Sequence, residues 1–227
     1  MEGVRVQALR PDLLLIPEGE VLASNDPIAT IAKRLLPRPK PVGAGTPPDW
    51  MPETAHQRPP RAAAVLIALV RRPEGLTVLY TERSADLRTH SGQVAFPGGK
   101  IDPADRDAAA AALREAEEEV ALDPADAKVL GYMPDYFTGS NFLITPVVAL
   151  VRPRRPFIPN PDEVSALFEV PLPMLADEAS YGTFRISRGG TEHTTWQIDH
   201  QGRMIWGITA NLTRQFRDMA LAGPLSW

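Results

Sequence analysis

The sequence lacks one residue type altogether, because none of its 227 residues is cysteine. Disulfide bonds, thiolate nucleophiles and cysteine-ligated zinc are therefore excluded. If the protein binds a metal ion, oxygen atoms are the expected ligands, and that donor set suits Mg²⁺ or Mn²⁺.

The sequence also lacks a strong excess of charge and a long apolar run. Its net charge of −4 provides no basic surface for duplex nucleic acid and no basic cluster for anionic lipid. The apolar run Leu13–Ile16 is too short for the core of a signal peptide or for a membrane span. We therefore expect a cytoplasmic protein without a nucleic-acid or membrane partner.

Proline is concentrated near the N-terminal end, where residues 1–60 hold 11 of the 24 prolines. This composition predicts a proline-rich N-terminal extension over residues 1–60 and one domain over residues 61–227. A chain of this length, with 44% hydrophobic residues, can bury one substantial core. The sequence leaves open whether the extension covers a site, covers a partner subunit or does neither.

One short helix is expected within the extension, over residues 28–36. Its start is predicted at Asn25 or Asp26, with Pro27 in the first turn, because such residues cap helices and proline tolerates that position. Residues 37–60 are expected to form an extended arm lying on the domain, or a linker.

Four apolar stretches of the domain predict β-strands, and they cover residues 62–70, 76–81, 128–132 and 142–151. The turn sequence Pro73-Glu74-Gly75 predicts that the first two strands pair as a hairpin. Pro146 in the last stretch predicts an edge strand, a bulge or a bend, because proline cannot donate a hydrogen bond to a neighbouring strand.

The C-terminal part predicts a hairpin and then a helix. Residues 184–186 and 194–198 flank the turn sequence Arg188-Gly189-Gly190. Residues 205–221 carry apolar side chains at steps of three and four, which is typical of an amphipathic helix. Its apolar face is expected to face the core, with a dimer interface as the alternative.

Two polar or proline-rich segments are predicted to be loops. They cover residues 135–141 and 152–161, and the second is expected to be mobile.

A stretch of glycine and acid residues lies between the predicted strands. Gly98 and Gly99 precede a helical segment on which Glu115, Glu118 and Glu119 share one face. Like charges at this spacing cost about 0.2–0.5 kcal/mol per pair, and a bound divalent cation would turn that cost into affinity. A solvated acidic face is the alternative.

The ends of this helix have capping signals. Either Asp102-Pro103 or Asp107 is expected to cap its start, and Leu122-Asp123-Pro124 to end it. Arg114 lies four residues before Glu118 and is expected to orient that carboxylate.

These residues resemble the Nudix box, in which a glycine is followed by an acid and then by an Arg-Glu-X-X-Glu-Glu core. The core here reads Arg114-Glu115-Ala116-Glu117-Glu118-Glu119. Three features depart from the pattern: the first acid is Asp105, one additional residue separates it from Arg114, and Ala121 replaces a late glycine. None of them alters the core.

A second signature adjoins the first, over residues 79–99, and resembles that of the coenzyme A diphosphatase branch of the Nudix family. It includes Arg83, Arg88 and His90 and ends in Phe96-Pro97-Gly98-Gly99. Arg83 and Arg88 are candidates to hold a phosphate. His90 either donates to a phosphate or holds its loop in place, and Arg83 has the alternative of pairing with an acid.

The resemblance also implies roles for the acidic residues. Glu115, Glu118 and Glu119 are expected to be the metal ligands, with Arg114 orienting them. Glu115 or Glu163 is the candidate general base, and Glu163 is alternatively a further ligand or only a helix cap or turn residue.

The loop residues of the box are expected to have roles other than binding the metal ion. The absence of a side chain at Gly98 and Gly99 would let the backbone approach the metal site and the substrate. Asp105 is expected to cap or orient rather than to bind metal directly.

The resemblance implies an α/β fold, namely the Nudix α/β/α sandwich around a mixed β-sheet. It implies metal-dependent hydrolysis of the diphosphate of coenzyme A, or of a derivative, to 4′-phosphopantetheine and adenosine 3′,5′-bisphosphate. The alternatives are hydrolysis of another nucleoside diphosphate derivative, such as ADP-ribose or NADH, or a domain that binds without turnover. The expected partner is a small-molecule substrate, and a homodimer stays open.

Overall fold

The structure is a computed structural model that describes residues 26–39, 59–84, 92–188, 191–223 and 225. The α-helices of these residues are α1 Pro27–Arg34, α3 Ala108–Val120, α4 Leu172–Ala176 and α5 Gly207–Phe216. The strands are β1 Arg61–Arg72, β2 Gly75–Arg83, β3 Val94–Ala95, β4 Gly98–Lys100, β5 Ala127–Tyr132, β6 Tyr136–Phe137, β7 Phe142–Val151, β8 Val164–Pro171, β9 Gly182–Arg188, β10 Thr191–His200 and β11 Arg203–Trp206. Short 3₁₀ helices cover Pro124–Asp126 and Glu178–Ser180, and a π-helix covers Arg217–Leu221.

The main sheet is mixed, as the α/β prediction requires. Its central order is β3-β2-β1-β7-β5, with β8 on β2, β4 on β1 and β6 on β7. Strand β1 runs parallel to β7, whereas β1 and β2 form the predicted antiparallel hairpin. The four predicted strands are confirmed as β1, β2, β5 and β7.

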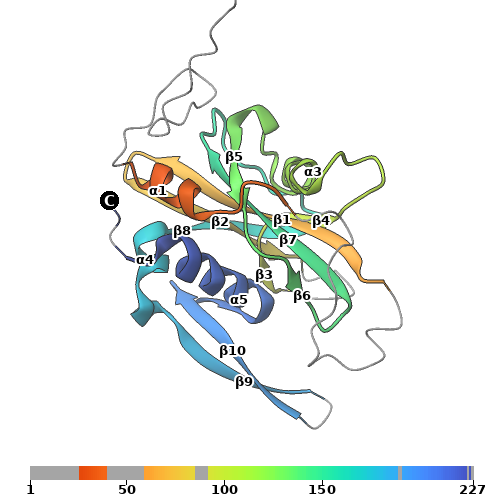
Figure 1. Ribbon diagram of the computed structural model, residues 1–227, viewed down its shortest axis with the longest axis vertical. Coiled ribbons are helices and arrows are strands. Elements are labelled where there is room, and N and C mark those ends of the chain that lie inside the picture. The colour runs from red at the N-terminus through yellow and green to blue at the C-terminus, as the bar shows by residue number, and fades with distance from the viewer. Residues whose placement is uncertain (1–25, 40–58, 85–91, 189–190, 224, 226–227) are drawn as a thin grey trace, which may run out of the picture.

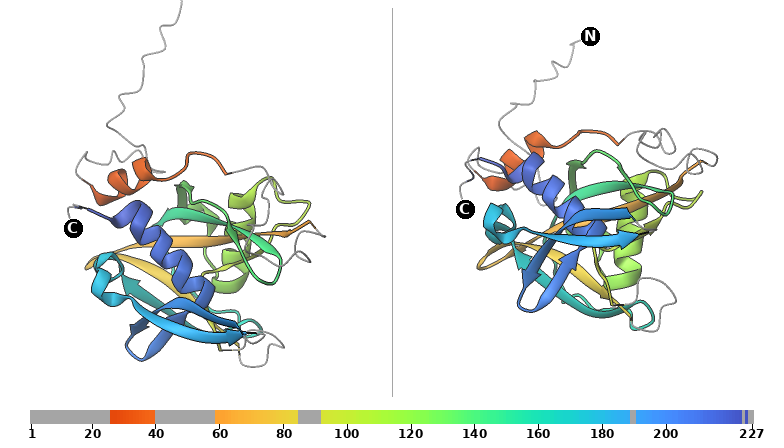
Figure 2. Two further views of the ribbon diagram at one scale, coloured as in Figure 1. Left: turned by 60° about the horizontal axis from the view of Figure 1, so that its bottom comes forward. Right: turned by 90° about the horizontal axis from the view of Figure 1, so that it is seen from below.

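Helices cover both faces of this sheet, which gives the predicted α/β/α sandwich (Figure 1, Figure 2). On one face, five alanines of α3 pack on small and branched residues of β1 and β7, and their short side chains let the helix lie close to the sheet. On the other face, α1, α4 and α5 enclose a core of larger side chains that includes Tyr80, Phe96 and Phe168. The sheet therefore separates two cores, and the acidic helix belongs to the smaller one.

Pro146 lies in an interior strand, so the edge strand, one of its three predicted possibilities beside a bulge and a bend, is wrong. Residue Tyr132 of β5 pairs with Val147, and Tyr136 of β6 pairs with Ile144. Pro146 lies at the change of partner between β5 and β6, where its carbonyl oxygen accepts from the Met133 amide at 3.0 Å. A missing N–H is tolerated at this interruption because the ladder itself is broken there.

Several strands were not predicted. Short strands β3 and β4 lie in the glycine-rich stretch, β6 lies in the predicted loop over residues 135–141, and β8 follows Glu163. The predicted late hairpin is confirmed as β9 and β10, but a third strand, β11, joins it. Residues 205 and 206 are therefore strand, and the predicted helix begins only at Gly207.

The predicted helix in the N-terminal extension is confirmed as α1, capped by the Asp26 side chain, which accepts from the Ile28 amide at 2.8 Å. Ile28 and Ile31 of this helix are fully buried in the larger core. Of the arm or linker predicted over residues 37–60, residues 40–58 lie outside the described part of the chain.

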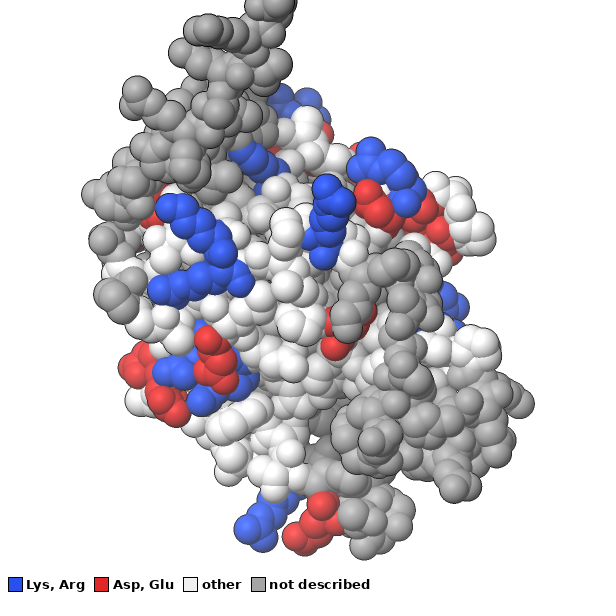
Figure 3. Space-filling model, viewed as in Figure 1, with Lys and Arg blue, Asp and Glu red and all other residues white. Residues whose placement is uncertain are grey.

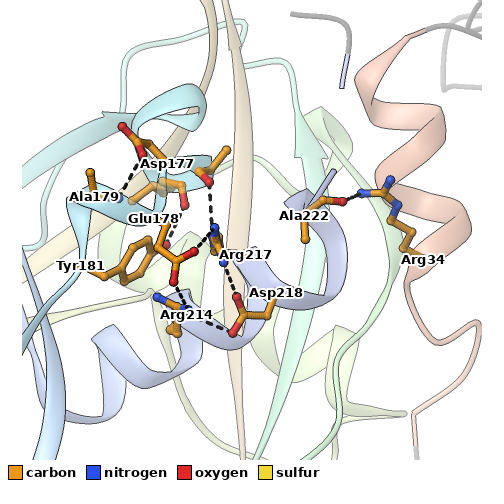
Figure 4. Close-up of polar contacts among 11 residues, drawn as sticks. Arg34, Asp177, Glu178, Ala179, Tyr181, Arg214, Arg217, Asp218 and Ala222 are labelled. Carbon is orange, nitrogen blue, oxygen red and sulfur yellow. Dashed lines mark hydrogen bonds and ion pairs between the residues drawn. The ribbon is translucent and has the colours of Figure 1, made fainter. Parts of the chain in front are cut away.

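Charged side chains join α1 and the C-terminal segment to their neighbours (Figure 4). Arg34 donates to the carbonyl oxygens of Ala220 and Ala222 at 3.0 and 2.7 Å. Arg214 and Arg217 each form ion pairs with two carboxylates, one on either side, and these are Glu178 and Asp218. The N-terminal helix, α5 and the segment after α4 are thereby held together.

On the face shown in Figure 3, charged side chains of both signs are spread among uncharged areas, and the described residues form no continuous basic surface there. Within the described part of the chain, no helix is long and apolar enough to cross a membrane.

Candidate functional site

Helix α3 begins at the second of the two predicted caps. The Asp107 side chain accepts from the Ala110 amide at 2.8 Å and thereby satisfies one of the free amides at the start of the helix. Asp102 lies outside the helix, where its exposed carboxylate is 3.8 Å from Arg114.

The end of α3 explains one departure from the Nudix pattern. Ala121 adopts a left-handed conformation with φ 54°, and its amide donates to the Glu117 carbonyl oxygen at 3.0 Å. The next amide, that of Leu122, reaches back to the Ala116 carbonyl oxygen at 3.3 Å. Glycine is favoured at such a position because it has no Cβ to strain the backbone. Here alanine adopts the same conformation.

The two glycines bring the backbone of β4 against the acidic face of α3. The Gly98 amide donates to Oε2 of Glu119 at 3.1 Å. A Cβ at Gly99 would lie 2.5 Å from Cδ of Glu115, and one at Gly98 would lie 2.4 Å from the Ala64 carbonyl oxygen. Any side chain at either position would therefore displace a carboxylate or strand β1.

The three box glutamates differ in burial. Glu119 is 3% exposed, Glu115 is largely buried, and the Glu118 side chain is 53% exposed. Among the described residues, no three acidic or histidine side chains lie close enough together to form a ready metal cluster. The fold thus turns Glu115 and Glu119 inward and leaves Glu118 at the surface above them.

Burial raises the pKa of the Glu119 carboxyl to about 7, and the nearby charges of Glu163 and Glu115 act in the same direction. The hydrogen bond from Gly98 and the charge of Arg83 oppose this rise. Burial likewise raises the pKa of Glu115, against the hydrogen bond from Arg114. Both carboxylates therefore lie where a further positive charge would stabilise them.

Arg114 lies at the centre of the charged contacts of α3. It donates from Nε and Nη2 to the two carboxylate oxygens of Asp105, each at 3.0 Å, and from Nη1 to Glu115 at 2.9 Å. Its distance to Glu118 is 3.5 Å, so it pairs more closely with Glu115 than with the residue it was predicted to orient. The Arg114 hydrogen bond holds the pKa of Asp105 below its usual range.

Asp105 also accepts from the Asp102 amide at 2.8 Å, which closes the loop before α3. Its side chain is directed at Arg114 and that loop.

Two further predicted site residues, Arg83 and Glu163, lie near the box glutamates of α3. Glu163 lies just before β8, where its carbonyl oxygen accepts from the Ser84 amide at 2.9 Å, next to Arg83 at the end of β2. The charge of Glu163 raises the pKa values of both Glu115 and Glu119, and that of Arg83 lowers the pKa of Glu119. Arg83 and Glu163 therefore lie beside the box glutamates. Arg88 and His90 lie outside the described residues.

The loop over residues 152–161, predicted to be mobile, is bonded to the end of α3. Its Ile158 and Asn160 amides donate to the Val120 and Glu119 carbonyl oxygens at 3.0 and 2.9 Å. Asn160 then accepts from the Glu163 amide at 3.0 Å, so it links Glu119 to Glu163 through the backbone. The sequence analysis did not predict this link. The sequence Asn160-Pro161-Asp162, which is typical of a turn, was the signal that could have indicated it.

Comparison with known proteins shows the family of the chain. The NUDIX domain family matches residues 60–186. A Salmonella typhimurium protein described as the uncharacterized Nudix hydrolase NudL is 44% identical over 169 residues, which cover 74% of this chain and 85% of that protein. NudL of Salmonella typhi matches to the same extent.

The comparison with solved structures finds similarity to RenU, a Nudix hydrolase from M. smegmatis, and to DR0079 from Deinococcus radiodurans. RenU has a TM-score of 0.43 and 26% identity, covering 52% of this chain and 74% of its own. DR0079 has a TM-score of 0.44 and 18% identity, covering 68% of this chain and 82% of its own.

A mixed sheet between helices, with a glycine loop that leads into a helix of Arg-Glu-X-X-Glu-Glu pattern, is typical of the class of Nudix domains. Because the family match spans more than half of the sequence and NudL is similar over most of it, this chain belongs to the Nudix family.

Proposed function

We propose that the protein hydrolyses the diphosphate bond of coenzyme A, or of a coenzyme A derivative, with Mg²⁺ or Mn²⁺. The products are 4′-phosphopantetheine, or its acyl form, and adenosine 3′,5′-bisphosphate. Membership of the Nudix family supports hydrolysis of a nucleoside diphosphate derivative, and the signature over residues 79–99 supports coenzyme A.

The observation that carries the metal-dependent part of this proposal is the buried carboxyl of Glu119, which lies within electrostatic reach of Glu115 and Glu163. Glu115 and Glu163 act on this buried carboxyl with like charge, and burial raises its pKa to about 7. The donors are oxygen atoms, which Mg²⁺ and Mn²⁺ prefer, so the residues fit such an ion. Glu115, Glu118 and Glu119 would hold it.

The bound ion would neutralise the diphosphate and lower the pKa of an attacking water. The protein residues then have separate tasks. Arg114 holds Glu115 in position through the hydrogen bond at 2.9 Å, and is itself held by Asp105. Gly98 donates to Glu119 and thereby leaves its other carboxylate oxygen for a ligand.

Glu163 is the better candidate for the general base. One carboxylate oxygen of Glu115 already accepts a hydrogen bond from Arg114 at 2.9 Å and is therefore occupied. In the part of the chain that the structure describes, Glu163 has no such ion pair and lies within electrostatic reach of both box glutamates. We therefore propose that Glu163 accepts a proton from the water that attacks the diphosphate.

Arg83 is proposed to hold a phosphate oxygen. Its Nε atom is buried and has no hydrogen-bond partner among the described residues. Because a buried guanidinium nitrogen without an acceptor is costly, a phosphate at this position would stabilise it.

A substrate panel tests the proposal and its alternatives. The purified protein is incubated with Mg²⁺ or Mn²⁺ and with coenzyme A, acetyl-coenzyme A, ADP-ribose or NADH, and the products are identified by mass. The highest kcat/KM is expected for a coenzyme A compound, cleaved to adenosine 3′,5′-bisphosphate. Preference for ADP-ribose or NADH would instead indicate the sister activity, and no turnover would indicate a binding domain.

A further inference from the structure

A pocket of about 590 Å³ opens on the face of the main sheet that carries α3. Leu79 of β2 and Leu167 and Glu169 of β8 lie in its wall on the sheet side, and residues 153–157 line it on the loop side. The volume is within the range of small-molecule sites, which is about 300–1,000 Å³. None of the box glutamates lines it.

The lining of this pocket has a net positive charge, because it contains three arginines and one glutamate. Arg72 is bonded to Glu169 at 2.5 and 3.1 Å. Arg154 is paired with Asp126 and Asp123, which line a neighbouring cavity that shares Arg155 and Phe157 with this one. The charge of Arg155 lowers the pKa of Asp126. Within the described residues, however, Arg155 forms neither an ion pair nor a hydrogen bond, so its guanidinium is the group left for an anionic ligand.

The pocket and the acidic site lie along the same pair of strands. In the antiparallel register of β2 and β8, Arg83 pairs with Val164 and Leu79 pairs with Glu169. Arg83 and Leu79 are four positions apart on β2, which corresponds to about 13 Å at roughly 3.3 Å per residue. The same loop, residues 152–163, borders the pocket at one end and bears Glu163 at the other.

Resting on the proposed function, we infer that this pocket takes the adenosine 3′-phosphate end of coenzyme A while the diphosphate lies at Arg83. Arg155 pairs with the 3′-phosphate, because a guanidinium matches two phosphate oxygens with a fork of donors. Phe157 supplies an aromatic ring of the kind on which a nucleobase stacks. Arg155 thus distinguishes coenzyme A from dephospho-coenzyme A.

Kinetics with the two substrates test this assignment. In Arg155→Ala, the ratio of KM for coenzyme A to KM for dephospho-coenzyme A is expected to rise about tenfold, as loss of a charged hydrogen bond predicts. Arg155→Lys, which keeps the charge but not the fork, is expected to give a smaller rise. Arg185→Ala removes an exposed arginine of β9 and should leave the ratio unchanged. An unchanged ratio in Arg155→Ala overturns the assignment.

Calorimetric binding provides a readout that does not depend on turnover. The full-length protein with Mg²⁺ is expected to bind adenosine 3′,5′-bisphosphate about tenfold more tightly than adenosine 5′-phosphate, and Arg155→Ala to lose this preference. Equal binding of the two nucleotides by the unaltered protein contradicts the pocket. If coenzyme A is not hydrolysed but the preference is present, the proposed function fails and the pocket stands.

Discussion

At the scale of single residues, Glu119 is a charged side chain in surroundings that disfavour its charge. It is a carboxylate at 3% exposure, near two other carboxylates, and its compensating contacts are the Gly98 amide and the charge of Arg83. Burying a charge is costly unless it is paired. A cation bound beside Glu119 would offset the cost of burying its charge near two other carboxylates, so the site is suited to a cation.

Replacement of the inward-facing glutamate tests its role in catalysis. Glu119→Gln keeps the shape but removes the charge, and is expected to lower kcat/KM for coenzyme A more than tenfold, equivalent to more than about 1.4 kcal/mol. Glu118→Gln should have a similar effect. Glu117→Gln, on the same helix but outside the proposed ligand set, is the matched control and should retain activity.

The raised pKa of Glu119 predicts how the metal-free protein responds to pH. Its carboxyl has a pKa of about 7 in the folded state and about 4.3 when unfolded. The folded state therefore binds the proton more tightly, and this contribution to stability, present below about pH 4.3, is lost as the pH rises to about 7.

Urea unfolding with a chelator present measures this effect. The free energy of unfolding is expected to decrease by a contribution on the order of 3 kcal/mol between pH 4.5 and pH 7.5. In Glu119→Gln that contribution should be absent. Identical pH dependence of the two proteins would contradict the assignment of the shift to Glu119.

The residues that the sequence could and could not predict differ in a physical way. Glu115, Glu119 and their glycine loop were predictable because helical spacing alone places the acids on one face. The partners of Arg114 were not, since it donates two hydrogen bonds to Asp105, which lies nine residues earlier and on a loop. A contact of that kind depends on how the loop folds back, which spacing does not determine.

At the scale of elements, α3 shows how a helix end can depart from the family pattern without changing the helix. Ala121 adopts the left-handed conformation, in which glycine has less steric strain than alanine. The two hydrogen bonds that end the helix, from the Ala121 and Leu122 amides, are nonetheless formed. The missing glycine therefore reflects a tolerable strain and not a different end to the helix.

Ala121→Gly is expected to stabilise the protein by about 0.5–1 kcal/mol, because glycine adopts positive φ without steric strain. Ala110→Gly, in the first turn of the same helix, should destabilise it by a similar amount, because glycine has a lower helix propensity than alanine. Urea unfolding of both variants checks the opposite signs. Destabilisation by Ala121→Gly would show that the conformation at this residue is different.

Long apolar strands were predicted correctly, whereas short or half-exposed ones were missed. Strands β1 and β7 are buried on both faces and read as continuous apolar runs. Strand β8 has alternating exposure, and β3 and β4 have only two and three residues, so tertiary pairing rather than local sequence determines them. The edge prediction for Pro146 failed for the same reason, since the gap between β5 and β6 is a property of the sheet.

At the scale of the whole molecule, segments distant in sequence meet on the face opposite α3. Helix α1 buries Ile28 and Ile31 against the core, and Arg34 bonds to the carbonyls after α5. A domain boundary at residue 61 stays a prediction. Because α1 packs into the core of the domain, we propose that α1 is part of that domain.

Truncation of the buried side chains of α1 tests that view. Ile28→Ala and Ile31→Ala are each expected to cost about 2–4 kcal/mol, as for other large-to-small changes in a packed core. Lys33→Ala, on the exposed side of the helix, should change stability by less than about 0.5 kcal/mol. Equal, small effects for all three would show that α1 is not part of the cooperative fold.

The most direct test of the account is the reaction of the unaltered protein with coenzyme A. With Mg²⁺ or Mn²⁺, mass spectrometry should detect 4′-phosphopantetheine and adenosine 3′,5′-bisphosphate in equal amounts, and neither with a chelator or with Glu119→Gln. Intact coenzyme A in the presence of metal would contradict the proposed reaction, and equal cleavage by Glu119→Gln would contradict the proposed site.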